Sequence, residues 1–408
     1  MPMTSVEQPR ATYRRVFAVR EFRALLAGFA VFLVSETVQM LALSVLIYAS
    51  TGSPLLAALA YVAGFLPQAL GGTVLLAVAD RWRPRRILLD FDALRLTVAV
   101  LLASGWLPPA AMVLLVFVVG GVAPIANASR TALLPEMLHG DEYVLGRSLF
   151  TVTSAGMQVL GAAVGGVLLL TLGPVGALWL TAAVCVVSAA VNRFGLADRP
   201  ARTTLHSVFR RGSTESVGGP GAVRQTWQVN RRLLADPAVR GLLLAQWLPG
   251  ALMVAAEGVV VPYSGPAAGF LLASAAGGML VGEFVVGRFL PPRLRERLTP
   301  WFALLLGVPL LVFVLEPGVV AAAIVLALAA AGFAYHLGLA RRFLDAVPEA
   351  HRGQAFGLAT TGTMTLQGLS MAAAGGLAEV LAPGTVMALA GAASVLATIT
   401  LWRRLAGP

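Results

Sequence analysis

The chain has 408 residues, of which 58% are hydrophobic and 12% charged, and its mean hydropathy is +0.82. A soluble protein carries about twice this charged fraction, so the composition excludes a soluble globular domain. The formal net charge is +11, but the arginines stand in short segments between apolar runs. This distribution is typical of membrane topology signals and argues against a nucleic-acid-binding protein.

Apolar runs of about 20 residues recur along the chain, and each is long enough to cross a ~30 Å hydrocarbon core as a helix. The N-terminal segment has arginines but no short apolar region with a cleavage site, so we expect no cleavable signal peptide. The sequence therefore predicts an all-α polytopic membrane protein with 12 transmembrane helices. The predicted spans are 24–49, 54–79, 87–106, 109–133, 144–171, 174–194, 238–262, 266–290, 299–316, 318–342, 354–381 and 384–402.

The connections between these spans alternate in character. Tight Gly/Pro turns without arginine, such as "TGSP" and "YSGP", follow the odd-numbered spans. Arginine-bearing segments, such as "DRWRPRR" and "RFLPPRLRER", follow spans 2, 4, 8 and 10. Arginine is enriched at the cytoplasmic ends of membrane helices. We therefore expect both termini to be cytoplasmic.

The longest connection, residues 195–237, is polar and divides the chain into two halves of six spans each. We expect an N-terminal six-helix half (1–194), a cytoplasmic central loop (195–237) and a C-terminal six-helix half (238–408). Within the loop, "RQTWQVNRRLLAD" could form an amphipathic helix on the inner leaflet. Duplicated halves indicate an alternating-access transporter with its substrate site between them.

The segment 79–88, "ADRWRPRRIL", resembles the loop signature of the major facilitator superfamily. "LIYASTGSP", "ANASRTALLPEML" and "AVPEAHRGQAFGL" resemble segments of its bacterial drug- and siderophore-exporter branch, as actinobacterial members have them. "GMQVLGAAVGGVL" resembles the fifth-helix glycine pattern of antiporters, with Ala162 at the usual proline position. The resemblance implies the major facilitator fold, export by proton antiport, and a multi-pass location in the bacterial cell (inner) membrane.

Glu36 lies about 18 Å into the first span, near the middle of the bilayer. Insertion scales charge about 2.5–3.5 kcal/mol for an ionised carboxylate at this depth. Glu36 is therefore a candidate proton carrier or partner of a cationic substrate, with Gln39 one turn further on. The alternative is a neutral Glu that forms a structural hydrogen bond between helices.

Three further titratable residues in the second half are candidates for proton coupling. Glu257 is expected to face Glu36 across the interface between the halves, although its place near a turn could also leave it hydrated. Glu283 is a proton-site candidate that could instead pair with an arginine. His336 is a candidate proton relay, and the alternative is a structural hydrogen bond.

Charged residues at the inner end of the first half are candidates for a conformational gate. A carboxylate at Asp80 could dock at the N-terminus of span 11, where the helix dipole favours it by about 0.3–1 kcal/mol; the alternative is a set of topology charges. The full set expected to form the gate and a buried charge network is Asp80, Arg81, Arg85, Arg86, Asp90, Asp92, Arg95 and Arg130. Gly161, Gly165 and Gly166 are expected to allow close helix packing.

The sequence lacks a Gly-rich phosphate loop with Lys, a His/Cys cluster with metal-ligand spacing and a readable Ser/His/Asp arrangement. We therefore expect no enzyme, no metal and no cofactor. The expected function is secondary active export of a small, largely apolar compound by proton antiport, by a monomer whose partners are the substrate, protons and the lipid bilayer. We expect no basic residue deep in the first half, which argues against an anion carrier. Alternatives are a proton-coupled importer, a lipid transporter, or a transport-inactive scaffold or receptor.

Overall fold

The structure is a computed structural model in which every assigned element of the described residues is helical. It describes residues 12–64, 67, 82–139, 141–199, 220–348 and 352–406. The helical fold class expected from the composition is confirmed.

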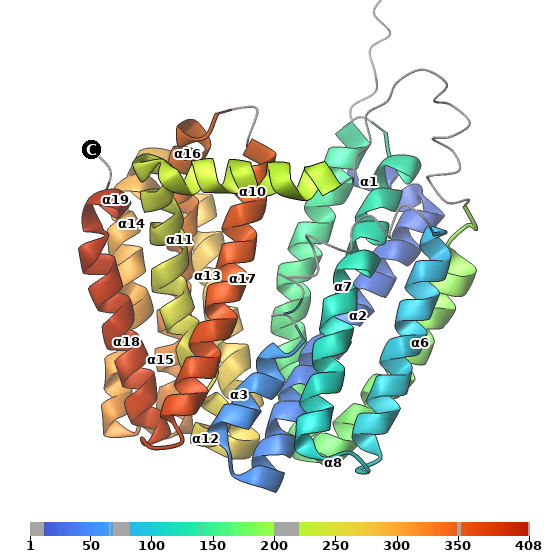
Figure 1. The fold of residues 1–408 in the computed structure, drawn as a ribbon, viewed down its shortest axis with the longest axis horizontal. Helices are drawn as coiled ribbons and strands as arrows, with labels where there is room; N and C mark the ends of the chain where they lie inside the picture. The colour runs from blue at the N-terminus through green and yellow to red at the C-terminus, as the bar shows by residue number, and fades with distance from the viewer. Residues whose placement is uncertain are drawn as a thin grey trace, which may run out of the picture.

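The helices form two groups that follow each other along the chain (Figure 1). The N-terminal group contains α1 (Tyr13–Ala18), α2 (Arg20–Thr51), α3 (Pro54–Val62), α6 (Pro84–Ala103), α7 (Pro109–Met137) and α8 (Asp141–Gly195). The C-terminal group contains α11 (Pro237–Glu257), α12 (Val260–Ser264), η1 (Gly265–Ala267), α13 (Ala268–Phe289), α14 (Pro292–Gly307), η2 (Pro309–Leu315), α15 (Val319–Ala331), η3 (Gly332–Ala334), α16 (Tyr335–Ala346), α17 (Arg352–Leu377), α18 (Pro383–Thr400) and α19 (Trp402–Ala406). Between the groups lies α10 (Pro220–Ala235).

Short sequence signals set the helix boundaries. Proline stands at the first helical position of α3, α6, α7, α11, α14 and α18, where its missing N–H is not needed. Ser53 caps α3 by accepting a hydrogen bond from the backbone N–H of Leu56 at 3.1 Å. Gly52 ends α2 in the left-handed conformation, with φ of 66°, which glycine adopts without strain.

Seven helices among the described residues are long and apolar enough to cross a membrane, judged by length and composition. Two of these stretches, Leu145–Gly195 and Pro237–Phe289, are 51 and 53 residues long. Each exceeds twice the ~20 residues that one crossing requires. The first is interrupted at Gly173, where the backbone leaves the helical region with φ of 68°.

Several predicted boundaries differ from the structure. The ninth span was placed at 299–316, but α14 already begins at Pro292 and gives way to the 3-10 helix η2. The tenth span was placed at 318–342, but the helical stretch is broken by η3 and continues to Ala346. Polar first turns such as "PRLRER" hide these helix starts from an analysis that follows hydropathy.

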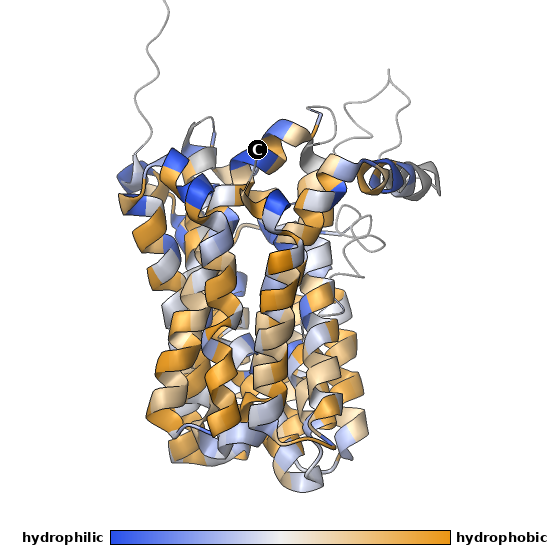
Figure 2. Cartoon of the chain, turned by 90° about the vertical axis from the view of Figure 1, so that its left-hand side faces the viewer, coloured by the Kyte–Doolittle hydropathy of each residue, from blue (hydrophilic) through white to orange (hydrophobic). Residues whose placement is uncertain are grey.

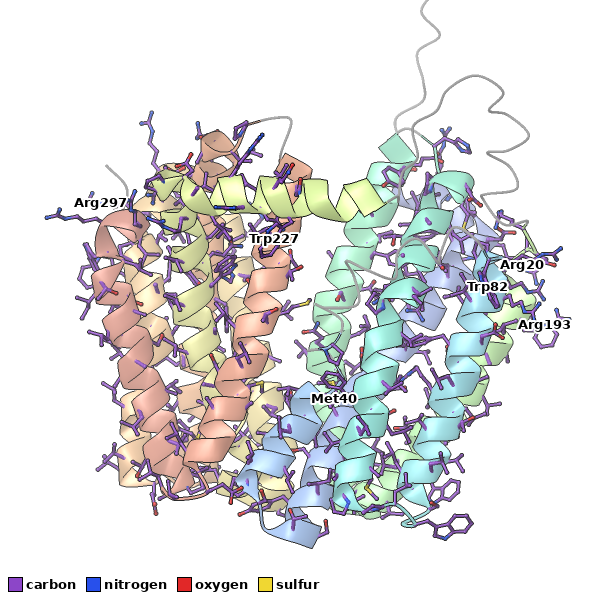
Figure 3. All side chains as sticks on the ribbon, viewed as in Figure 1. Arg20, Met40, Trp82, Arg193, Trp227 and Arg297 are labelled. Carbon is purple, nitrogen blue, oxygen red and sulfur yellow. The ribbon has the colours of Figure 1, made fainter. Side chains whose placement is uncertain are left out.

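The two ends of the molecule differ in chemistry. We call the end that carries the turns at Gly52, Gly105, Gly173 and Gly265 the turn end, and it lies at the bottom of Figure 1. The opposite end is the arginine end, where Figure 3 shows Arg20, Arg193 and Arg297. Figure 2 shows apolar helices between the ends and hydrophilic residues gathered at the arginine end.

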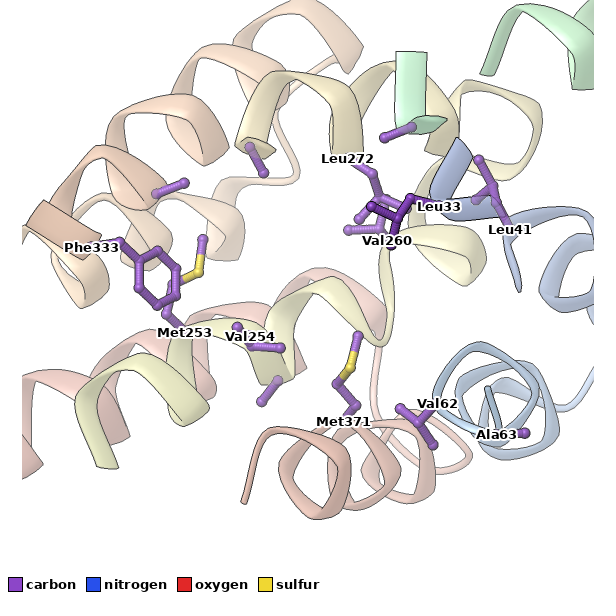
Figure 4. Packing of buried hydrophobic residues seen from close by; sticks show 14 of the residues in the cluster. Leu33, Leu41, Val62, Ala63, Met253, Val254, Val260, Leu272, Phe333 and Met371 are labelled. Carbon is purple, nitrogen blue, oxygen red and sulfur yellow. The ribbon is translucent and has the colours of Figure 1, made fainter. Parts of the chain in front are cut away.

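The two groups meet at the turn end through close backbone approaches. A Cβ built on Gly166 of α8 would lie 2.8 Å from the carbonyl carbon of Gly269 in α13. A Cβ on Gly375 of α17 would lie 2.6 Å from the Cβ of Ala58 in α3. Figure 4 shows buried apolar residues of both groups packed together, with Val62 of α3 beside Met371 of α17. Small residues therefore let helices of different groups touch at this end.

Candidate functional site

A cavity of about 660 Å³ lies between the two groups. Its volume falls within the ~300–1,000 Å³ that is usual for small-molecule sites. Figure 3 shows Met40, one of its lining residues, between the groups and far from the labelled arginines. Its apolar lining consists of Phe29, Phe32, Leu33, Met40, Leu134, Phe150, Ala162, Val254, Leu272, Ala275, Ala276, Met279, Ala330, Phe333, Met364 and Met371. Its polar lining consists of Glu36, Thr37, Tyr61, Asn127, Arg130, Thr131, Arg147, Ser154, Gln158, Glu257 and Gln367.

Each group contributes one carboxylate to this cavity. Glu36 lies near the middle of the 32-residue α2, and Glu257 is the last residue of α11. Both side chains line the cavity, so the structure brings these two predicted site residues together. A carboxylate inside a membrane is costly when ionised, and an intramembrane site of this kind commonly takes part in ion or proton movement.

Two arginines of the N-terminal group, Arg130 and Arg147, also line the cavity, and the expectation of no deep basic residue in the first half is wrong. The Arg130 guanidinium lies 4.4 Å from the ring centroid of Phe32 and donates a hydrogen bond to Asn127 Oδ1 at 2.8 Å. Arg95 lies behind the same ring, at 4.6 Å from its centroid. Arg95 is 4% exposed and Arg130 is 3% exposed, so both cations are buried.

The error has a simple origin in the helix boundaries. The sequence placed the ends of the third and fourth spans at residues 87 and 133, whereas α6 begins at Pro84 and α7 continues to Met137. Arg95 therefore lies on the order of 16 Å from the start of its helix, and Arg130 on the order of 10 Å from the end of its own. Arg95 also donates a hydrogen bond to Ser35 Oγ at 2.7 Å, next to Glu36.

Asp92 is fully buried and is held by α8. Its two carboxylate oxygens accept hydrogen bonds from Ser188 Oγ at 3.0 Å and from Asn192 Nδ2 at 2.7 Å. Asp90, two residues earlier, is exposed and pairs with Arg86 at 3.8 Å. The expected charge network is thus divided between an exposed pair and a buried cluster.

The remaining gate candidates that the structure describes lie at the arginine end. Asp80 and Arg81 fall outside the described residues. Arg85 donates a hydrogen bond to the backbone carbonyl of Arg193 in α8. Neighbouring Arg83 pairs with Asp198 at 2.8 Å. These contacts stay within the N-terminal group.

Three of the five candidates for proton coupling do not line the cavity. Gln39 is buried in α2, and Glu283 is half-buried in α13. His336 Nε2 lies 3.2 Å from the backbone carbonyl oxygen of Gln246 in α11, within the C-terminal group. The structure thus places His336 in a contact between helices of one group.

The three glycines of α8 that were expected to allow close helix packing lie against other helices. A Cβ on Gly161 would approach the Cβ of Thr37 to 2.8 Å, and one on Gly165 would approach a methyl carbon of Leu41 to 3.3 Å. Gly161 and Gly165 thus pack on α2, whereas Gly166 packs on the C-terminal group.

Sequence reasoning missed several polar residues of the cavity. Asn127, Gln158 and Gln367 were overlooked, although amides inside apolar spans carry a detectable signal. Ser188 and Asn192, which hold Asp92, stand four residues apart and thus on one helix face. Within the part of the chain that the structure describes, no group of three or more His, Cys, Asp or Glu could hold a metal ion.

Comparisons with known proteins agree with this architecture. A family model described as Major Facilitator Superfamily matches residues 25–340. No curated protein matched the chain significantly. Among solved structures, the nucleoside transporter NupG (D323A mutant) is 14% identical with a TM-score of 0.68, and the match covers 94% of this chain and 99% of that one.

Two further solved structures show the same fold. A bacterial homologue of the human lysosomal transporter Spinster, in an inward-facing and unoccupied conformation, is 16% identical with a TM-score of 0.64, covering 97% of this chain and 96% of that one. The xylose transporter XylE from E. coli, in an inward-open conformation, is 15% identical with a TM-score of 0.62, covering 95% and 96%.

Proposed function

The chain belongs to the major facilitator superfamily, and we propose that it exports a small, largely apolar compound by proton antiport. It is a secondary transporter rather than an enzyme. Glu36 and Glu257 lie on opposite walls of one cavity whose other residues are mostly apolar, and this is the observation that carries the proposal. Apolar and aromatic walls suit an apolar cargo, and the carboxylates suit a proton.

The proposed membrane arrangement follows from charge. Arginine gathers at one end of the helices, so this end is assigned to the cytoplasm together with both termini. Twelve crossings in two six-helix halves are consistent with the lengths of the described helices. We propose a monomer in the bacterial cell membrane.

Glu36 is the proposed proton carrier. It must be protonated in one conformation and ionised in another, so that a proton moves each time the cavity changes sides. Arg130 and Arg95 both contact the ring of Phe32, which precedes Glu36 by one helical turn in α2, so two cations lie near this part of the cavity wall. Glu257 is the second candidate, because it lines the same cavity from the C-terminal group.

Transport in proteoliposomes tests this function. The fluorescent amphipathic dye Hoechst 33342 serves as the probe, and an imposed pH gradient supplies the energy. We expect the wild-type protein to concentrate the dye and Glu36→Gln to lose this accumulation while counterflow persists. Glu316→Gln, at an exposed turn, is the matched control and should retain accumulation. Full accumulation by the Glu36→Gln protein would exclude Glu36 as the proton site.

A polar solute imported by proton symport is the second candidate. Asn127, Gln158 and Gln367 provide hydrogen-bonding groups in the cavity, and Arg130 adds a positive charge. These groups favour a cargo with several polar atoms. The sign of the pH gradient that drives accumulation of the cargo distinguishes the two functions. In antiport, protons must leave the liposome as the cargo enters, whereas in symport protons must enter with it. A protein that moves neither class in either direction would instead be the scaffold or receptor considered above.

A further inference from the structure

Glu379 lies in the turn that follows α17 at the turn end, and its side chain reaches from the C-terminal group to the N-terminal group. Its Oε1 accepts a hydrogen bond from the Ser53 hydroxyl and a second from the backbone N–H of Leu55 at 3.0 Å. Gly375, four residues earlier on the same face of the chain, is the point where α17 touches α3. Glu379 therefore extends a backbone contact that already joins the two groups.

The receiving site is the N-terminus of α3. The first N–H groups of a helix have no partner within the helix, and the helix dipole favours a negative charge there. Ser53 is the capping residue of α3, and Leu55 belongs to its first turn. The Glu379 carboxylate thus supplies a cap for α3 from another part of the fold, more than 300 residues away in sequence.

We infer that Glu379 is a latch that holds the turn end closed, so that the cavity opens toward the arginine end while the contact is intact. This inference rests on the alternating-access function proposed above. To open the turn end, α3 and α17 must separate, because α17 at Gly375 lies directly against the backbone of Pro54 and Leu55 and the Cβ of Ala58 in α3. Separation also breaks both hydrogen bonds of Glu379. The contact therefore stabilises one of the two conformations and not the other.

The latch depends on the charge of the carboxylate. The Ser53 hydroxyl and, second to it, the Leu55 amide lower the pKa of Glu379 below its ordinary value. A lowered pKa means that the contact favours the ionised form, so its stabilising effect is complete above the ordinary Glu value. This effect is lost as the pH falls through the lowered pKa.

The neighbouring elements add little competing charge. α3, α12 and α18 contain no charged side chain, and the last turn of α2 contains none. α11 carries Glu257 near the turn end, and that side chain lines the cavity. Glu316, directly after η2, is a further turn-end carboxylate and lies beside Gly384 of α18. Protonation of Glu379 from the turn-end solution is therefore the titration expected to release the latch.

Double electron–electron resonance tests the latch without a known substrate. Labels are placed at Trp106→Cys and Gly318→Cys, one in each group at the turn end, in a Cys185→Ala protein in lipid nanodiscs. We expect Glu379→Gln to raise the ratio of long to short turn-end distances by about two- to fivefold, the size of a helix-terminus charge effect. Glu316→Gln, a turn-end carboxylate within the C-terminal group, should leave the ratio unchanged.

A titration to acidic pH and substitutions of Ser53 complete the experiment. The wild-type ratio should rise only once the pH falls below the ordinary Glu value of about 4.3, and this rise should be absent from the Glu379→Gln protein. Ser53→Thr keeps the hydroxyl and should preserve the short distances, whereas Ser53→Ala should lengthen them. An unchanged distance distribution in Glu379→Gln would overturn the latch. The distance measurement does not depend on dye transport. An unchanged distance distribution would therefore refute the latch without affecting the proposed function, and a failure of dye transport would refute the proposed function without affecting the measured distances.

Discussion

The ring of Phe32 lies against the guanidinium of Arg130, at 4.4 Å from the ring centroid. Arg95 stacks on the same ring at 4.6 Å, so one aromatic side chain contacts two buried cations. Phe32 and Arg130 line the cavity, and Arg95 lies behind them beside Ser35. The ring thereby links the cavity wall to the buried polar residues of the N-terminal group.

Phe32→Leu should destabilise the N-terminal group more than a Phe→Leu substitution at another buried position. Buried cation–π contacts contribute about 0.5–2 kcal/mol each, and the change removes two of them. Phe91→Leu is the matched control, because Phe91 is equally buried and packs on Phe32. Thermal unfolding of both purified variants gives the comparison. Equal losses would mean that the cation–π contacts add nothing beyond ring packing.

Asp92→Asn should destabilise the protein, whereas Asp90→Asn should not. The first variant removes a buried negative charge and leaves one acceptor oxygen where Asp92 has two, which now accept hydrogen bonds from Ser188 and Asn192. A hydrogen bond to a charged group contributes about 1.5–3 kcal/mol. Asp90 forms an exposed pair with Arg86, and such pairs contribute about 0–1 kcal/mol. The shift of the thermal unfolding midpoint of each variant relative to the wild type tests this difference. A larger loss for Asp90→Asn would contradict the assignment of Asp92 as the structural carboxylate.

Much of the fold could be predicted because apolar length and arginine placement report on the membrane directly. Glu36 and Glu257 were also recognisable, since a carboxylate in an apolar span stands out. The Arg95–Phe32–Arg130 stack was not predictable, because it depends on where α6 begins and where α7 ends. The Glu379 contact was not predictable either, since it joins positions 326 residues apart.

Impermeant thiol reagents should label the turn end from outside intact cells. Trp106→Cys and Gly318→Cys, each in a Cys185→Ala protein, occupy exposed turn-end positions; Trp106 is 85% exposed. Arg293→Cys, at the start of α14 at the arginine end, should react only after the membrane is permeabilised. The expectation rests on the enrichment of arginine on the cytoplasmic side. Labelling of Arg293→Cys in intact cells would reverse the assigned orientation.

α10 should lie in the interface of the membrane at the arginine end. Figure 1 shows it running across the helix bundle, and Figure 2 shows it standing out from the other helices. Val229 and Leu233 are buried, whereas Trp227, Arg231 and Arg232 are exposed. This division suits a helix that rests on anionic lipid headgroups.

Quenching of Trp227 by brominated lipids measures this placement. Lipids brominated near the headgroup should quench the fluorescence that Trp227→Phe removes, and more strongly in anionic than in zwitterionic bilayers. Arg231→Gln with Arg232→Gln should abolish the dependence on anionic lipid, because each arginine contributes about 1 kcal/mol near such a surface. Identical quenching in both lipids would leave α10 without an electrostatic attraction to the membrane.

Asp80→Asn should shift the protein in the direction opposite to Glu379→Gln. Asp80 lies outside the described residues, and the sequence predicts that it docks at the N-terminus of α17 when the arginine end is closed. Loss of this charge should raise the population open at the arginine end by about two- to fivefold. Labels at Phe194→Cys and Arg341→Cys report the change, with Asp90→Asn as the control. An unchanged distribution would reduce Asp80 to a topology charge.

The double variant Asp80→Asn with Glu379→Gln is the stricter test. Glu379 follows α17 and caps the N-terminus of α3, and Asp80 follows the predicted span that begins with α3 and is expected to cap the N-terminus of α17. The same pair of transmembrane helices would then be held together at both ends. The sequence predicts Asp80 at the end opposite to Glu379, and for two sites that far apart the effects should add in free energy. Opposite shifts of similar size should therefore cancel, and the double variant should return to the wild-type ratio of conformations at both label pairs. A double variant that follows either single variant alone would show that only one of the two carboxylates controls the conformational equilibrium.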